Sequence, residues 1–353
     1  MKSQLRNTRR QLLLALSLLP LASFSFAQPA ADAQTITATG LHSFGLRVSD
    51  VERSVAFYQG LFGSPVVARI GEKVVLQLGD GPEYFTISPV RAGDQPHISY
   101  FGLAVPGATR FQLQARLQEH GLNRTVDSMH SNQSTALNRA MHSWLERLPG
   151  DEDDTTMLAD NQELFFADPN GVVVQLTSPN DCGLGDAPCT PEPAPGPGLI
   201  ELIEINHMTT FVHNYQVTND FYRKVFGFQD QAFQGTFPLL GVGEGTHFLM
   251  FVGGAQPGSP TQPGRIDHAS LNMENFAVDT LLQTLTDYGL SARQEGQNGP
   301  LQHWVSWRMP ERGGAAPNGT PEVYFSDPDG IAIQLQHHTY CGGGNEFGGD
   351  CGQ

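Results

Sequence analysis

Hydrophobic and polar positions alternate along two segments of the chain, His42–Val48 and Asn206–His213, as they do in strands that bury one face. After each segment the hydrophobic positions recur every three or four residues, over Val51–Leu61 and over Gln216–Phe226. This longer period is typical of an amphipathic helix. Each half of the chain is therefore expected to open with a strand followed by a helix.

The same order of elements continues in both halves. Two strands joined by a Gly-acid-Gly turn follow the helix, then another strand, a second helix that ends at a glycine, and a final pair of strands. An Asp-Pro-x-Gly sequence makes the tight turn inside that final pair. The later strands are expected at Ser99–Val105, Glu163–Ala167 and Val172–Leu176 in the first half, and at His268–Met273, Glu322–Ser326 and Ala332–Gln336 in the second.

The first half carries an insertion at about residues 123–161. Within it, Ser134–Leu148 is expected to be helical, and Asp151–Asp154 is expected to form an acidic surface loop.

The two halves are copies of one domain. A Phe-Tyr pair that begins at Phe57 recurs at Phe221, and an Asp-Pro-x-Gly turn that begins at Asp168 recurs at Asp327. Both markers repeat at nearly the same spacing, and a repeat of this length indicates a duplicated domain and not a short solenoid unit. The copies can therefore be compared position by position, and a difference between them indicates chemistry that only one copy kept.

The segment 1–27 reads as an export signal. It begins with four basic side chains and continues with an apolar run, Leu12–Ala27, that is shorter than the roughly 20 residues a bilayer span needs. Thr8–Leu13 also resembles a twin-arginine signal, and an ordinary secretory signal stays an equal alternative. We therefore expect an exported protein, periplasmic or extracellular, with no membrane span once the signal is removed.

The chain is acidic, with a formal net charge of −16. Removal of the signal takes away four basic residues and no acidic one, so 16 basic face 36 acidic side chains and the net charge becomes −20. This balance argues against nucleic acid and anionic membranes as partners. A small molecule is the expected partner, and a homo-oligomer stays open.

The four cysteines lie in polar, glycine- and proline-rich stretches just after the final strands of each half. An even count in an exported protein favours disulfides. We expect Cys182 to pair with Cys189 and Cys341 with Cys351, each closing a short loop. A metal site made of cysteines is the alternative.

The resulting domain organisation has five parts. They are the signal peptide (1–27), an N-terminal module (37–180), a Cys/Pro/Gly-rich linker (181–199), a C-terminal module (200–340) and a Gly-rich tail bounded by cysteines (341–353).

This order of elements, with the Phe-Tyr pairs at Phe57 and Phe221 and the turns at Asp168 and Asp327, resembles the vicinal oxygen chelate superfamily. That superfamily includes glyoxalase I, fosfomycin and bleomycin resistance proteins, and extradiol ring-cleavage dioxygenases. The resemblance implies an α+β fold of two tandem modules. Each module would consist of paired βαβββ units that form a half-open, curled sheet.

The resemblance also implies where metal ligands lie, namely on the first strand, on the strand before the second helix and on the last strand. The residues at these positions are His207, His268 and Gln334 in the C-terminal module, and Ser43, Tyr100 and Gln175 in the N-terminal module. Two imidazoles suit a divalent Fe, Mn, Zn or Ni ion, whereas serine and tyrosine do not. We expect a metal site in the C-terminal module only, with Fe(II) as the first choice.

The residues around the last strand match extradiol dioxygenases more closely. Tyr324 precedes the Asp-Pro-x-Gly turn as a tyrosine does in those enzymes, but Gln334 stands where they have glutamate. A structural role for Gln334 therefore stays open. The resemblance further implies that His247 is the acid–base group and that His303 is a second pocket histidine, although His303 is separated from the last strands by an inserted loop.

The function that these residues indicate is an exported, metal-dependent dioxygenase that cleaves a catechol-type aromatic with O₂. His247, Tyr324 and His303 would be its catalytic residues. A glyoxalase-like lyase or isomerase acting on another vicinal-oxygen substrate is one alternative. A non-catalytic protein that binds a small molecule is the other.

Overall fold

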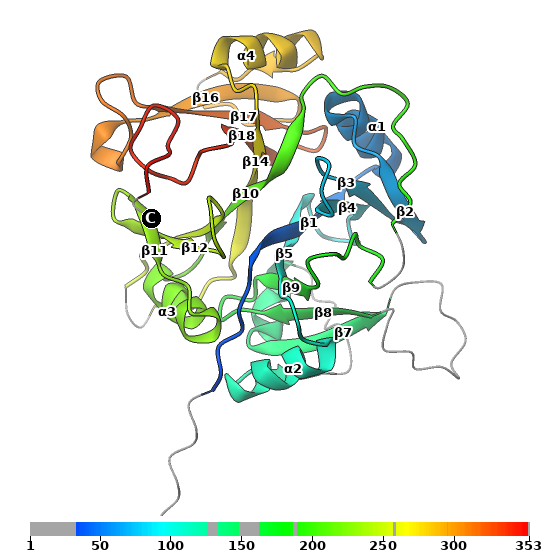
Figure 1. The fold of residues 1–353 in the computed structure, drawn as a ribbon, viewed down its shortest axis with the longest axis vertical. Coiled ribbons are helices and arrows are strands. Elements are labelled where there is room, and N and C mark those ends of the chain that lie inside the picture. Colours follow the sequence, from blue (N-terminus) through cyan, green and yellow to red (C-terminus); the bar gives the residue numbers. More distant parts are fainter. Residues whose placement is uncertain are drawn as a thin grey trace, which may run out of the picture. The chain divides into compact units, whose positions relative to one another are not determined.

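Two copies of one strand arrangement make up the fold (Figure 1). The computed structural model describes residues 33–125, 133–147, 162–185, 189–256, 259–294 and 296–351. The expected signal at 1–27 and the loop Asp151–Asp154 lie outside these residues. Residues 33–353 cluster as one unit, so the boundaries between the modules stay sequence-based predictions.

Both modules follow the element order that the sequence predicts. The N-terminal module contains β1 (Gly40–Val48), α1 (Val51–Phe62), β2 (Val66–Ile70), β3 (Lys73–Gln77), β4 (Tyr84–Pro89), β5 (His97–Ala104), α2 (Arg110–Glu119), β6 (Asn123–Arg124), β7 (His142–Arg147), β8 (Gln162–Ala167) and β9 (Val173–Thr177). The C-terminal module contains β10 (Leu202–Phe211), α3 (Tyr215–Phe226), β11 (Asp230–Gln234), β12 (Phe237–Gly241), β13 (Phe248–Val252), β14 (Arg265–Met273), α4 (Val278–Asp287), β15 (Ser291–Ala292), β16 (Gln302–Arg308), β17 (Thr320–Ser326) and β18 (Ala332–His337).

The strand order is the same in the two modules. In the N-terminal module it is β2-β3-β4-β1-β5-β9-β8-β7-β6, with β1 parallel to β4 and antiparallel to β5. The C-terminal order is β11-β12-β13-β10-β14-β18-β17-β16-β15. A bridge between Ile98 of β5 and Ile266 of β14 joins the two sheets. The predicted fold of paired βαβββ units is thereby confirmed.

The first helix of each module begins and ends where its local sequence dictates. The side chain of Asp50 caps α1 by accepting a hydrogen bond from the Arg53 backbone N–H, and Asn214 caps α3 in the same way. Gly63 and Gly227 end the helices with φ of 67° and 73°, a left-handed conformation that favours glycine.

The insertion of the N-terminal module differs from its predicted helix. Gln133–Arg139 forms a 3₁₀ helix, but β7 follows it and pairs with β8. Trp144 is buried and stacks on Phe165 of β8, with ring centroids 6.1 Å apart. Burial of this aromatic pair against the sheet outweighs the weak local preference for a helix.

Each first helix packs against the last strands of the other module. The Tyr58 hydroxyl of α1 donates to Asp327 at 3.1 Å, and the Tyr222 hydroxyl of α3 donates to Asp168 at 3.5 Å. The ring of Phe57 likewise lies 6.1 Å from that of Phe325. The hydrophobic core therefore runs through both modules without interruption.

A short loop closed by a disulfide follows the last strand of each module. Cys182 pairs with Cys189 and Cys341 pairs with Cys351, which confirms the predicted pairing. In the C-terminal module the Asn206 side-chain amide donates to the Tyr340 carbonyl at 2.6 Å and holds this tail on β10. No helix among the described residues is both long enough and apolar enough to cross a membrane.

Candidate metal centre

Three strands bring His207, His268 and Gln334 to one face of the C-terminal sheet. His207 on β10 lies opposite Ser270 on β14, which in turn lies beside Gln334 on β18. His268 precedes Ser270 by two positions and so shares its face. The ring centroids of the two histidines are 5.6 Å apart with planes at 80°, and all three side chains are buried. Two imidazoles in this arrangement can share one ion.

Neighbouring oxygen atoms determine which ring nitrogen of each histidine is left for a ligand. Nδ1 of His207 bonds the Asn206 side-chain oxygen at 2.6 Å, and Nδ1 of His268 bonds Asp267 at 3.0 Å. In each case Nε2 is the nitrogen left for a ligand. Nε2 of His268 is buried with no hydrogen-bond partner among the described residues. Imidazoles that bind metals are typically oriented in this way by an oxygen on the other nitrogen.

A β-bulge supplies the carboxylate beside His268. Between the pairs Thr209–His268 and Thr210–Ile266, β14 has one extra residue, Asp267. A bulge of this kind re-aims a side chain next to a site. Burial alone would raise the pKa of Asp267, but the hydrogen bond to His268 and the charge of Arg265 keep it below its ordinary value.

Gln334 completes the set with an amide that lacks partners. Both its nitrogen and its oxygen are buried without a hydrogen-bond partner in the described part of the chain. The Gln334 amide lies close enough to His207 to raise the pKa of its imidazole slightly against the effect of burial. No hydrogen bond of normal geometry joins the two side chains. Burial, and next the neighbouring His268, hold the pKa of His207 well below its ordinary value, so its imidazole is neutral.

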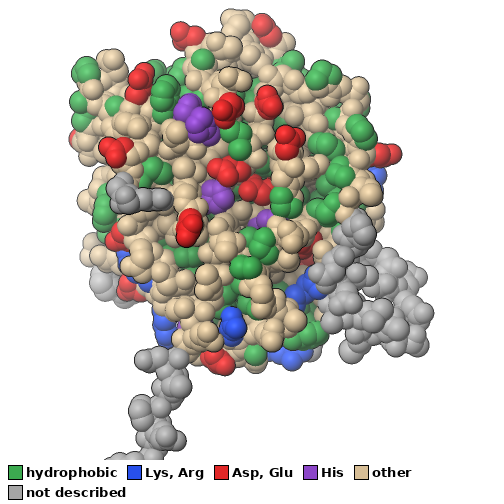
Figure 2. All heavy atoms as spheres, viewed as in Figure 1, with side chains coloured by type: hydrophobic (Ala, Val, Ile, Leu, Met, Phe, Trp, Pro, Cys, Tyr) green, Lys and Arg blue, Asp and Glu red, His purple; other side chains and the backbone are tan. Residues whose placement is uncertain are grey.

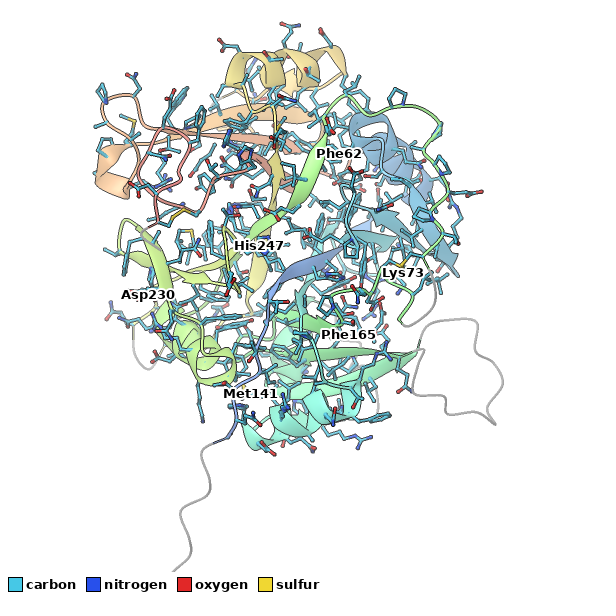
Figure 3. The ribbon with its side chains drawn as sticks, in the orientation of Figure 1. Phe62, Lys73, Met141, Phe165, Asp230 and His247 are labelled. Carbon is cyan, nitrogen blue, oxygen red and sulfur yellow. A yellow bond between two sulfur atoms is a disulfide. The ribbon has the colours of Figure 1, made fainter. Side chains whose placement is uncertain are left out.

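The matching position of the N-terminal module is filled by its own side chains. The Gln175 oxygen accepts hydrogen bonds from Ser43 at 2.6 Å and from Tyr84 at 3.1 Å, and its nitrogen donates to Glu163 at 3.2 Å. Lys73, labelled in Figure 3, pairs with Glu163 at 3.1 Å. Among the described residues, two of the three ligand positions of the C-terminal module, His268 and Gln334, therefore hold buried polar atoms without partners, and their N and O chemistry fits a divalent metal.

Aromatic rings surround the two histidines. The His207 ring stacks on Phe248, at 4.3 Å, and on Tyr340, at 5.7 Å, and these two rings also contact each other at 6.1 Å. The Tyr324 ring stands edge-on to His268 at 5.2 Å, so the structure brings this predicted residue to the candidate site.

A buried ion pair lies behind this layer, and sequence reasoning missed it. Arg308 is fully buried and donates to Glu322 at 3.2 Å. Glu322 also accepts from Tyr340 at 2.9 Å and from Tyr324 at 3.4 Å. The repeat held a signal for it, because Glu322 occupies the position of Glu163 in the other copy and both carboxylates are paired with a cation.

The structure does not bring His247 to this site. The next residue, Phe248, faces His207, so His247 lies on the other side of the strand. Its Nδ1 accepts from the Leu41 backbone N–H at 3.2 Å, and its Nε2 lies 3.2 Å from Glu204 (Figure 3). The acid–base role that the sequence suggests is therefore not supported by the geometry, and His247 instead links the two modules.

Glu83 occupies the equivalent position in the N-terminal module and makes the mirrored contact. Its carboxylate accepts from the Ile205 backbone N–H at 2.7 Å. Ligand atoms of Glu83, Glu204 and His247 all lie within 4.8 Å of one another. Because Nδ1 of His247 is an acceptor, Nε2 carries the proton and donates to Glu204. Burial raises the pKa of Glu83 well above its ordinary value. The hydrogen bonds of this cluster therefore link the first strands of the two modules.

His303 is also directed away from the metal ligands. It bonds the Thr286 hydroxyl of α4 at 2.8 Å, and it lies opposite the core residue Phe325. The adjacent Trp304 faces the other way and stacks on Tyr324 with centroids 5.2 Å apart. The structure therefore places Trp304, and not His303, beside Tyr324 in the lining of the cleft described below.

A cleft of about 540 Å³ opens beside the candidate centre. Trp304 and Ala332 line it, and these two side chains lie next to Tyr324 and Gln334 on the same sheet face. Polar and charged side chains also line the cleft, among them His97, Arg265, Asp267, Arg293 and Gln302. The cleft thus lies beside the candidate centre, and His207, His268 and Gln334 are not among the residues that line it.

Comparison with known proteins begins at the sequence level. Residues 40–176 match the model of the Glyoxalase/Bleomycin resistance protein/Dioxygenase superfamily. A search of curated proteins by sequence finds no significant match.

Solved structures share the fold over most of the chain. A 2,3-dioxygenase from Pseudomonas sp. KL28 is 18% identical with a TM-score of 0.54, covering 85% of this chain and 93% of its own. The Mn(II)-bound glyoxalase from Novosphingobium aromaticivorans is 16% identical with a TM-score of 0.53, covering 85% and 82%. Homoprotocatechuate 2,3-dioxygenase from Brevibacterium fuscum is 14% identical with a TM-score of 0.55, covering 87% and 82%. At these identities the likeness establishes the fold alone.

Proposed function

Because residues 40–176 match the model of the Glyoxalase/Bleomycin resistance protein/Dioxygenase superfamily and solved dioxygenases share the fold, we propose that the chain is a metal-dependent enzyme whose C-terminal module holds the metal. We propose extradiol cleavage of a catechol-type aromatic as its reaction and an oxidising compartment outside the cytoplasm as its location. The two disulfides support that location.

One observation carries this proposal. The amide nitrogen and oxygen of Gln334 and Nε2 of His268 are buried without hydrogen-bond partners among the described residues, whereas the equivalent Gln175 is bonded by three side chains. An unpaired buried polar group costs about 1–3 kcal/mol, so several in one place support a missing ligand.

The chain's own residues would then act as follows. His207 and His268 would bind a divalent ion through Nε2, and Gln334 would bind it through its amide oxygen. The ion, Fe(II) first with Mn, Zn or Ni as alternatives, would supply Lewis-acid or redox chemistry toward two adjacent substrate oxygens and O₂. Tyr324 would donate a hydrogen bond to a substrate oxygen. Phe248 and Tyr340 would exclude water from the His207 ring.

Metal analysis of the purified protein tests the first step. We expect close to one divalent ion per chain, lost in His207→Ala and in His268→Ala. Gln334→Glu should bind the ion more tightly because it adds a negative charge. Gln175→Glu in the N-terminal module is the matched control and should leave the metal content unchanged. Wild-type protein without metal, after incubation with each candidate ion, would contradict the proposal.

Oxygen-dependent turnover tests the reaction. Protein loaded anaerobically with Fe(II) should convert a catechol to a yellow ring-opened product when air is admitted. Iron-loaded protein that consumes no O₂ with any diol would refute the dioxygenase assignment. Retained binding of a diol under those conditions would instead indicate a non-catalytic binding protein.

A glyoxalase-like lyase or isomerase is the second candidate, favoured by one feature. The neutral Gln334 leaves the centre one negative charge short of a His-His-carboxylate set, which suits a Lewis-acid ion that does not change oxidation state. Activity with Zn, Ni or Mn in the absence of O₂ would identify this candidate.

A further inference from the structure

Polar side chains continue beyond the candidate metal ligands on the same face of the C-terminal sheet. Ser270 and Asn272 follow His268 at two-residue steps along β14, so they share its face. On the neighbouring strand β18, Gln334 lies beside Ser270 and Gln336 lies beside Asn272. All of these side chains are buried. The interior of this module therefore contains a polar column, made of Ser270, Asn272 and Gln336, where apolar side chains are the rule.

Each residue of the polar column has a buried atom without a hydrogen-bond partner in the described part of the chain. These atoms are the Ser270 hydroxyl oxygen, the Asn272 amide oxygen and the Gln336 amide nitrogen. Buried polar atoms are normally bonded either to the protein or to ordered water, and one buried water typically makes about three such bonds. Three of these atoms on adjacent positions therefore indicate water molecules between them.

The spacing of the polar column suits such waters. A two-residue step along a strand measures about 6.7 Å, and neighbouring strands lie about 4.8 Å apart. A water that bonds two polar atoms spans about 5.6 Å, because each of its hydrogen bonds is about 2.8 Å long. One water can therefore bridge Ser270 and Asn272, and a second can join Ser270 to the candidate ligand Gln334 beside it.

The polar column ends at a carboxylate that reaches the surface. Nδ2 of Asn272 donates to Oε1 of Glu204 at 2.9 Å, and Oε2 of Glu204 lies 3.2 Å from Nε2 of His247. The Glu204 side chain is 32% exposed. Histidine and acidic side chains lie next to one another near the middle of the face in Figure 2, and Figure 3 labels His247 there in the same view. Burial alone would raise the pKa of Glu204, but the hydrogen bond from His247 keeps it below its ordinary value, so this carboxylate is ionised.

The described residues of the N-terminal module form no such column. Gly102 and Ala104 occupy the positions of Ser270 and Asn272. A Cβ atom added to Gly102 would lie 2.0 Å from the Ser43 hydroxyl oxygen, so neighbouring side chains already fill this space. The polar column therefore accompanies the candidate metal ligands and is not a requirement of the fold.

We propose that the C-terminal module contains a chain of water molecules that carries protons from the candidate metal centre along the polar column to Glu204 and the solvent. The inference rests on the proposed function for the source of the proton, a hydroxyl of the bound diol. The O–H bond of this hydroxyl breaks as the nearest water takes the proton. Each water, and the Ser270 hydroxyl, accepts one proton and passes one on, and the Glu204 carboxylate accepts the last and releases it to the solvent. Asn272 and Gln336 position the waters.

A room-temperature crystal structure of the metal-free protein tests whether the polar column is hydrated. We expect ordered waters within hydrogen-bond distance of the Ser270 hydroxyl and of the Asn272 and Gln336 amides. Asn272→Leu should exclude the water that bridges Ser270. Asn219→Leu on α3 is the matched control, because Asn219 is also buried with an amide that lacks partners among the described residues, and it should leave these waters in place. A dry column in wild type would overturn the inference.

Stopped-flow measurement of proton release tests whether the column carries protons. Protein loaded with Zn(II) is mixed with catechol under argon in weak buffer that contains a pH indicator. Wild type should release a proton as fast as catechol binds. Asn272→Leu should release it about 100-fold more slowly, the lower end of the effect of positioned proton transfer, while its affinity for Zn(II) stays unchanged.

Further variants separate proton transfer from a structural effect. Asn272→Ser leaves room for a water and should recover most of the rate, and added imidazole should speed proton release in Asn272→Leu. Glu204→Gln keeps the shape of the side chain but removes the acceptor, so it should also slow proton release. Asn219→Leu should behave as wild type. Equal rates in wild type, Asn272→Leu and Glu204→Gln would overturn the inference.

The two proposals can fail separately. A hydrated column in a protein that binds no ion would support the chain of waters and refute the metal-dependent function. Loaded protein that binds catechol but releases its proton at the same rate in every variant would refute the proton path and leave the function standing.

Discussion

The carboxylate of Asp267 fixes which nitrogen His268 offers to an ion. It is present because β14 has one residue more than its partner strand at this point. The N-terminal module has the same bulge, but Ser99 occupies it and donates to the Gly45 carbonyl. The two modules therefore differ in the residue at this bulge. Asp267 orients an imidazole, whereas Ser99 only makes a hydrogen bond to the backbone.

Asp267→Asn is expected to weaken metal binding by about 10- to 100-fold, the usual cost of losing such a partner of a ligating histidine. The amide keeps the size of the side chain but can present its N–H₂ group to Nδ1 and so disfavour the tautomer that leaves Nε2 free. Competition with a chromophoric chelator measures the change. Ser99→Ala should leave the metal affinity as it is, and an unchanged affinity in Asp267→Asn would show that the bulge does not orient His268.

Replacement by leucine is expected to have opposite effects on stability at the two equivalent glutamines, Gln175 and Gln334. In metal-free protein, Gln175→Leu should cost about 1–3 kcal/mol, because Ser43 and Tyr84 lose their acceptor. Gln334→Leu should be neutral or stabilising, since it removes an amide that has no partners among the described residues. Urea unfolding of both variants after chelation of metals measures the difference. Equal losses of stability would mean that Gln334 is satisfied in solution.

At the scale of elements, most of the fold follows from local pattern. The strand and helix at the start of each module lie within a few residues of their predicted bounds, because period and caps are encoded in adjacent residues. Local pattern does not reveal β7, because its strand conformation depends on pairing with β8, which is distant in sequence.

The candidate site could be predicted only in part for a related reason. His207 and His268 stand out because the matching positions of the N-terminal module, Ser43 and Tyr100, hold no histidine. The prediction for His247 is wrong because one residue along a strand decides the face that a side chain occupies. The sequence shows how far His247 lies from the Gly-x-Gly turn, but it does not show which face of the strand the side chain occupies. The prediction for His303 fails in the same way beside Trp304.

The turns that receive Tyr58 and Tyr222 are expected to make stability depend on pH. Burial raises the pKa of Asp168 to about 7 and that of Asp327 to about 6. Both carboxyls bind protons more tightly in the folded protein than in the unfolded chain, where the pKa is about 3.9. Their stabilising contribution is complete below about pH 4 and is lost as the pH rises through the folded-state values.

Asp168→Asn removes this titration and keeps an oxygen that accepts the N–H groups of Asn170 and Val172. Relative to wild type, its free energy of unfolding should rise between pH 4 and pH 8, by about 1.4 kcal/mol for each unit of raised pKa. Denaturant unfolding across this range gives the values. Asp220→Asn on the exposed side of α3 serves as control, and parallel curves for Asp168→Asn and wild type would exclude the effect.

For the whole molecule, the exchanged packing of the first helices makes the modules interdependent. Phe57 and Tyr58 of the N-terminal module complete the core around Phe325 and Asp327 of the C-terminal one. A module on its own would expose these surfaces to water. The continuous core therefore predicts that the two similar sequences fold as one unit.

We expect one calorimetric unfolding transition for residues 33–353, with equal calorimetric and van't Hoff enthalpies. Residues 33–199 expressed alone should show no cooperative transition. Two resolved transitions in the full chain, or a stable isolated N-terminal module, would show that the contacts of Phe57 and Tyr58 contribute little.

The stacking of Tyr340 on His207 has a consequence for metal exchange. Tyr340 comes directly before Cys341, whose disulfide to Cys351 closes the tail loop, and the Asn206 side chain holds the Tyr340 carbonyl on β10. Reduction of this disulfide is therefore expected to loosen the ring that covers the His207 imidazole and so to speed the release of a bound cation.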